Sequence, residues 1–414
     1  MPRIPSSGGP TDRRLLAAGA IAGLAVGAAV SGRLRQTRPV APGTLSDAGD
    51  QGFIDWDAVR SLAVRMNQQE PLLADERERL DVYYRSLVDQ CFPIVQAYTG
   101  IQLSGTSERT FTFDRVDWVG ANIEAFKHLL QPIEDMVARQ RAKGNTSFSG
   151  VNRRIASAEV GLLLGYLARR VLGQYDLALL GREPVEGGKL YYVEPNIRQI
   201  EATLGLPRND FRMWLALHET THAFEFEGNP WVPRYFNGLL NRYLGTVEHD
   251  ARLLTSGITG LRTLVGRTRS RDANSSWVEA VMTQEQRDIF GQLQALMCMV
   301  EGYSNHVMNA VGRDLLPTYD TISRRFEQRK SRRSPADELF GRITGLKLKM
   351  EQYRLGEEFI DAVVAARSHD VARRVWDGPE FLPTMGEIRN PSAWLTRIDQ
   401  MDGKAAVLTA GSPG

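Results

Sequence analysis

Two histidines and a glutamate at helical spacing are the residues of this chain best suited to metal chemistry. His218, Glu219 and His222 form a His-Glu-x-x-His pattern within residues 209–230. Residues four apart on a helix lie on one face, so both imidazoles can bind one metal ion. Glu219 stands beside them, where it can accept a proton from the water that the metal activates. The pattern therefore predicts a zinc site with one Zn²⁺ per chain and Glu219 as general base.

A third ligand must come from elsewhere, because a catalytic zinc is usually held by three protein side chains and one water. No histidine follows at the spacing of the longer His-Glu-x-x-His-x-x-Gly-x-x-His motif. Glu301 is the best candidate, since it lies at the edge of a mostly apolar helical stripe where a carboxylate is costly unless paired or metal-bound. Gly302 beside it would let another backbone approach closely. The alternative is a buried Glu301 paired with an arginine.

His306 and His249 are the rival metal ligands. His306 stands five residues beyond Glu301, off its helical face, which favours a supporting or substrate-contact role. His249 is flanked by charged residues, which favours an exposed side chain. A donor to the developing oxyanion would be a tyrosine, and these residues alone do not rank the candidates. The candidates are Tyr303, Tyr319 and Tyr353, with a packing role as the alternative for the last.

The elements that position these residues are predicted to be mainly helices. Apolar residues recur at helical spacing in residues 116–139, 153–180, 210–227 and 284–311. The helix with the zinc pattern should start at Asn209 or Asp210 and stop at residues 228–230, which puts the pattern in mid-helix. Short strands are indicated at residues 189–193 and 110–113. The expected fold class is therefore mainly α with little β structure.

Composition places the chain in the ordinary globular class. Its 414 residues are 42% hydrophobic and 24% charged, enough for a substantial core. The 51 basic and 49 acidic residues leave a net charge of +2, which does not indicate a nucleic-acid partner. Phosphate-binding glycine motifs are absent from the sequence, so nucleotide chemistry has no support. Cys91 and Cys298 are too few for a disulfide framework and are predicted to be small core residues.

One catalytic domain is predicted over residues 51–400, between two ends of different character. Residues 1–50 hold an apolar run at 15–30 and then a linker rich in Pro, Gly, Thr and Ser. The run could be a membrane anchor, a signal peptide with twin arginines, or a poorly ordered tail. Residues 401–414 are predicted to be a C-terminal tail. We expect a cytoplasmic protein, with membrane contact through residues 15–30 as the alternative.

Blocks of sequence along most of the chain stand in the order found in one protein family. They lie at residues 54–59, 170–176, 194–197, 218–222, 230–231, 300–302, 307–308, 382–384 and 391–394. In these blocks the chain resembles a family of bacterial zincin-like proteins. Members of that family are named zinc-dependent metalloproteases or hydrolases and are loosely associated with deazaflavin coenzyme biosynthesis. The N-terminal apolar run departs from the family.

The resemblance implies a largely helical zincin fold. It also implies zinc on His218 and His222 and, by the usual gluzincin arrangement, on Glu301, and it favours Tyr353 among the tyrosines. We therefore expect a zinc-dependent metallopeptidase that cleaves the amide bonds of a peptide or protein substrate. The alternatives are a hydrolase of a small amide and a non-catalytic zincin-like scaffold or binding protein. Glu219 argues against the scaffold, because a structural zinc has no use for a neighbouring base. The oligomeric state is left open.

Overall fold

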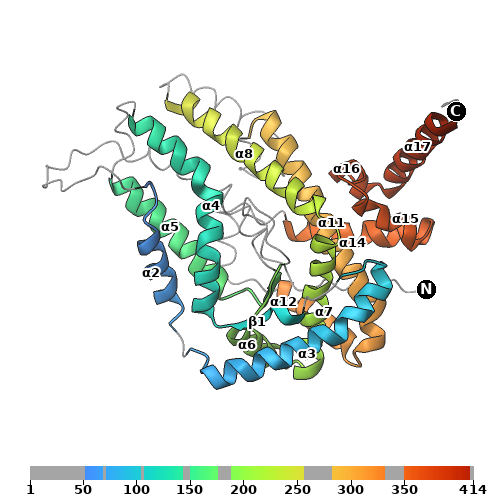
Figure 1. Cartoon of the computed structure of the whole chain (residues 1–414), viewed down its shortest axis with the longest axis horizontal. Coiled ribbons are helices and arrows are strands. Elements are labelled where there is room, and N and C mark those ends of the chain that lie inside the picture. Colours follow the sequence, from blue (N-terminus) through green and yellow to red (C-terminus); the bar gives the residue numbers. More distant parts are fainter. Residues whose placement is uncertain are drawn as a thin grey trace, which may run out of the picture.

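The structure is a computed structural model that describes residues 52–68, 71–103, 107–142, 150–175, 188–255, 282–331 and 349–410. The predicted N-terminal segment, residues 1–50 with the apolar run at 15–30, lies outside these ranges. Helices dominate the described part, as predicted, and surround one small sheet (Figure 1). Among the helices described, none is long and apolar enough to cross a membrane.

The helices pack around two main clusters of buried apolar side chains. The smaller cluster joins helices on one side of the molecule (Figure 1), namely α2 (Trp56–Met66), α4 (Arg115–Ala142), α5 (Gly150–Ala168) and the middle of α8 (Trp231–Thr255). The larger joins α3 (Ala74–Thr99), α6 (Glu194–Leu204), α7 (Arg208–Glu227), α11 (Gln284–Leu315), α12 (Tyr319–Ser331), α14 (Lys349–Ala366), α15 (His369–Arg373), α16 (Met385–Arg389) and α17 (Pro391–Ala410). Two short 3-10 helices, η1 (Ser107–Arg109) and η4 (Arg374–Trp376), complete the set in the described ranges.

The sheet has three strands, β1 (Thr110–Phe113), β2 (Gly173–Tyr175) and β3 (Leu190–Val193). The order is β1-β3-β2, with β1 parallel and β2 antiparallel to the central β3. The predicted strands at 110–113 and 189–193 are confirmed as β1 and β3. The helix predicted over 153–180 is wrong for residues 169–175, because the chain there turns and pairs with β3 as β2, and residues 176–180 lie outside the described ranges. Gly173 favours this outcome, since glycine is a poor helix former.

Helices α11 and α14 touch through two glycines. A Cβ on Gly302 would overlap the backbone of Gly356, and one on Gly356 would overlap the carbonyl of Cys298. The predicted close approach of a backbone at Gly302 is therefore confirmed, and it places α14 against α11 beside Glu301. Both cysteines are buried, as predicted, and neither forms a disulfide.

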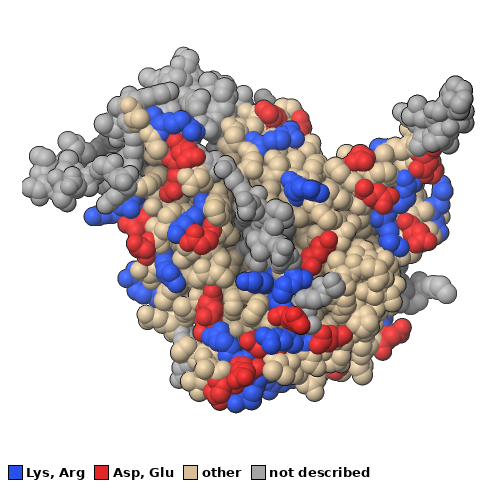
Figure 2. Space-filling model, in the orientation of Figure 1, with Lys and Arg blue, Asp and Glu red and all other residues tan. Residues whose placement is uncertain are grey.

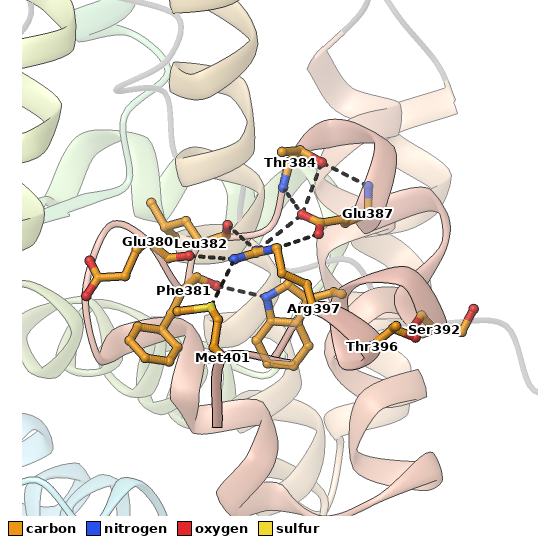
Figure 3. A network of polar contacts seen from close by, with 10 residues as sticks. Glu380, Phe381, Leu382, Thr384, Glu387, Ser392, Thr396, Arg397 and Met401 are labelled. Atoms are coloured by element: carbon orange, nitrogen blue, oxygen red, sulfur yellow. Dashed lines mark hydrogen bonds and ion pairs between the residues drawn. The ribbon is translucent and has the colours of Figure 1, made fainter. Parts of the chain in front are cut away.

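Arg397 holds the C-terminal helices together (Figure 3). From α17 it donates to Glu387 of α16 at 2.7 Å and to two backbone carbonyls of the loop before α16. Thr384 and Glu387 form a capping box at the start of α16, and Trp394 donates to the carbonyl of Phe381 at 2.8 Å. The blocks at 382–384 and 391–394 are thus structural. Helix α17 continues to Ala410, into the segment predicted as a tail.

Candidate metal centre

Helix α7 carries the His-Glu-x-x-His pattern through the middle of the larger core. It begins at Arg208 and ends before Gly228, within two residues of the predicted start and at the predicted stop. Almost every side chain from Phe211 to Phe226 is buried, because α7 is covered by α3, α11 and β2. A helix buried on all sides holds its side chains in fixed rotamers, which a metal site requires.

The three predicted ligands lie together. One ligand atom from each of His218, His222 and Glu301 falls within 4.8 Å of the others, and all three side chains are buried. The two Nε2 atoms are 3.1 Å apart, and Nε2 of His222 is 3.9 Å from Oε1 of Glu301. Zinc bonds of 2.0–2.2 Å in a tetrahedron put neighbouring ligand atoms about 3.4 Å apart. These separations lie on either side of that value, so the residues fit zinc.

The burial of this group also favours a cation. Glu301 is 2% exposed, and the two imidazoles are fully buried. A carboxylate at such depth is costly unless a positive charge or hydrogen-bond donors compensate for the lost water. When both imidazoles carry their proton on Nδ1, the Nε2 lone pairs of His218 and His222 point at the same space, where a cation can accept both. A divalent metal ion meets both requirements.

Glu225 fixes the orientation of His222. Its Oε2 lies 2.7 Å from Nδ1 of His222, and the Ser304 hydroxyl lies 3.1 Å from each of these two side chains. A proton on Nδ1 that is donated to a carboxylate leaves Nε2 as the lone-pair nitrogen facing the metal site. Sequence reasoning missed Glu225, although its place three residues after His222, on the same helical face, was an available signal.

Replacing Glu225 with alanine is expected to weaken zinc binding by about 10–100-fold. The change leaves Nδ1 of His222 without its carboxylate partner and makes the imidazole a poorer ligand. Competition with a chromophoric chelator of known zinc affinity measures the effect. Glu285→Ala, an exposed acid at the start of α11, is the matched control and should bind like the wild type. Equal affinity in both variants would show that Glu225 does not support the metal.

Glu219 stands beside the ligand group without belonging to it. Its side chain is 5% exposed and faces Gly173 at the start of β2. The carboxylate therefore lies between α7 and β2. A carboxylate in that place can exchange protons with a molecule at the metal site without occupying a coordination position.

His306, one of the two rival ligands, is engaged elsewhere. Its Nε2 lies 2.7 Å from the Tyr98 hydroxyl and its Nδ1 2.6 Å from Oδ1 of Asp361. Burial and then the charge of Asp361 raise the pKa of Tyr98 to about 12, so this hydroxyl stays protonated and donates to His306. With both ring nitrogens engaged, His306 is not placed as a ligand.

In the contacts that the structure gives, the hydroxyls of two predicted oxyanion donors, Tyr303 and Tyr319, meet residues outside the ligand group. The Tyr303 hydroxyl lies 3.4 Å from Nε2 of His369, and the Tyr319 hydroxyl donates to Asn309 at 2.5 Å. Burial raises the pKa of Tyr303 well above its usual value. His249 in α8 and Tyr353 in α14 have side chains outside the described part.

A buried His-His-Glu group with a neighbouring glutamate on its helix is the arrangement of a zincin. Residues 54–395 match the family of zincin-like metallopeptidases, and the chain belongs to that family. It is 42% identical to a protein from Chloroflexus aurantiacus whose crystal structure is described as that of "a putative hydrolase with a novel fold". The match has a TM-score of 0.64 and covers 84% of this chain and 99% of that one. No curated protein matches. The predicted family and mainly helical zincin-like fold are confirmed.

Proposed function

We propose that this chain is a zinc-dependent metallopeptidase. The observation that carries the proposal is the buried group of His218, His222 and Glu301 with Glu219 beside it. The residues suit one Zn²⁺ held by the three side chains, with room in the coordination shell for water or substrate. Membership of the zincin-like metallopeptidase family and likeness to a protein described as a hydrolase support amide hydrolysis.

Each residue of the site has a separate role in the proposed reaction. When bound, zinc supplies a Lewis acid that polarises the substrate carbonyl and makes water more acidic. Glu219 accepts a proton from the attacking water and passes it to the leaving amine. Glu225 and Ser304 keep His222 in the tautomer that presents Nε2 to the metal site. The covered position of α7 excludes bulk water from the carboxylates.

The position of β2 favours a peptide over a small amide. Within the described ranges β2 is the outer strand on its side of the sheet, and it lies against α7 where Glu219 stands. An extended peptide can pair with the edge of such a strand through its main chain. A peptide held in this way would carry its amide bonds past the general base.

Figure 2 shows the charged side chains on one face of the molecule. Basic and acidic side chains are interspersed there over the described residues. We therefore propose no charge preference for the substrate and no nucleic-acid partner, in keeping with the balanced composition.

Zinc content measured by elemental mass spectrometry tests the proposal. We expect about one zinc per wild-type chain and little in Glu301→Ala, because the variant loses one of three ligands. The zinc-loaded wild type should also hydrolyse a mixture of peptides. A wild type that stays metal-free when zinc is offered would overturn the proposal. Zinc binding with hydrolysis of small amides alone favours the small-amide enzyme, and zinc binding without any hydrolysis favours the scaffold.

A further inference from the structure

The strand β2 begins with a glycine that stands against the proposed general base. A Cβ built on Gly173 would lie 2.7 Å from both Cγ and Oε1 of Glu219 and 2.8 Å from its Cδ. Carbon atoms in proteins do not approach this closely, so any side chain at residue 173 must displace either the carboxylate or the strand. The Glu219 side chain therefore occupies the space that the glycine leaves.

Residue 173 must be a glycine because there is no room for a side chain, and not because of its backbone conformation. Among the described glycines the left-handed region of φ is occupied by Gly100 and Gly205, and Gly173 is in an ordinary strand conformation paired with β3. An alanine could adopt the same backbone angles without strain. The methyl group of an alanine would, however, overlap the Glu219 side chain and displace it.

Tyr192 borders the same space. It is the partner of Gly173 across the antiparallel pair of β2 and β3, and residues directly opposite in such a pair point to the same face of the sheet. Tyr192 is fully buried on this face, and burial followed by the charge of Glu219 raises its pKa well above the usual value. The Tyr192 ring on β3 and the absence of a side chain at Gly173 on β2 thus define the space that the Glu219 carboxylate occupies.

We propose that Gly173 is a positioning residue. Because it has no side chain, the Glu219 carboxylate can lie against β2, at the point where an extended substrate would lie. The inference rests on the proposed function and deepens it. Gly173 thereby lets the proposed general base lie next to the strand that would bind the substrate.

The first test separates kcat from KM. Gly173→Ala is expected to lower kcat about 100-fold, because displacing a catalytic group by about 1 Å has effects of that size. Zinc should stay near one per chain, and KM should change little, because the ligands and the strand edge are not altered. Gly291→Ala is the matched control, since a Cβ there meets nothing within 4 Å. An unchanged kcat in Gly173→Ala would overturn the inference.

The second test does not depend on activity. Thermal unfolding of the zinc-loaded protein should show a lower Tm for Gly173→Ala, and this loss should largely disappear in a Glu219→Ala background, where the crowded carboxylate is gone. Equal losses in both backgrounds would show that the added methyl group clashes with something else, and would also overturn the inference. This coupling can be measured even if the chain hydrolyses nothing, so the two proposals can fail separately.

Discussion

Replacing Glu219 with glutamine is expected to lower kcat for peptide hydrolysis by about 10²–10⁴-fold, the usual contribution of a general base. Glutamine has nearly the same shape but accepts no proton at neutral pH. Glu219 is not one of the three grouped ligands, so the variant should keep about one zinc per chain. Steady-state kinetics on a peptide that the wild type cleaves, with zinc measured on the same samples, checks both parts of the expectation.

Glu124→Gln is the matched control for Glu219→Gln. Glu124 is an exposed residue of α4 paired with Lys127, so its loss should leave kcat unchanged. Full activity in Glu219→Gln would remove the residue from the mechanism and leave the proton transfer to another group. Loss of zinc together with activity would mean that Glu219 supports the metal, and the assigned roles would have to be exchanged.

The metal helix could be predicted because its signal is local. His218, Glu219 and His222 lie within five residues, and a helix alone brings their side chains to one side. Glu301 lies far along the chain, but a carboxylate on an apolar stripe already indicated a special environment. The helix start and stop signals around residues 209 and 228 likewise needed no information about the rest of the fold.

The parts that sequence reasoning missed depend on contacts between distant segments. The strand β2 is three residues long, and its pairing with β3 overrides the helical apolar pattern around it. The role of Gly173 follows from where Glu219 lies in space, which no local pattern encodes. Glu225 looked like an ordinary helical acid until its distance from Nδ1 of His222 was known.

A buried charge network anchors the first half of the metal helix. Arg212 is fully buried, and it donates to Glu194 at 2.7 Å and to Glu201 at 2.6 Å, while Tyr84 donates to the other oxygen of Glu194 at 2.8 Å. Burial alone would lower the pKa of Arg212, but the hydrogen bond with Glu201 and the surrounding charges raise it above its usual value. The guanidinium therefore stays charged and ties α7 to α3 and α6.

Replacing Arg212 with methionine is expected to lower the free energy of unfolding by about 2–3 kcal/mol, because Glu194 loses its buried arginine partner and keeps only the more exposed Arg198 as a cationic partner, at 2.6 Å. Urea unfolding followed by circular dichroism measures the change. Arg79→Met, which removes the exposed pair with Asp75, is the matched control and should unfold like the wild type. In a Glu194→Gln background the Arg212 change should lower the free energy of unfolding less, since only the charged contact with Glu201 is then lost. A midpoint equal to that of the wild type would show that the network does not stabilise α7.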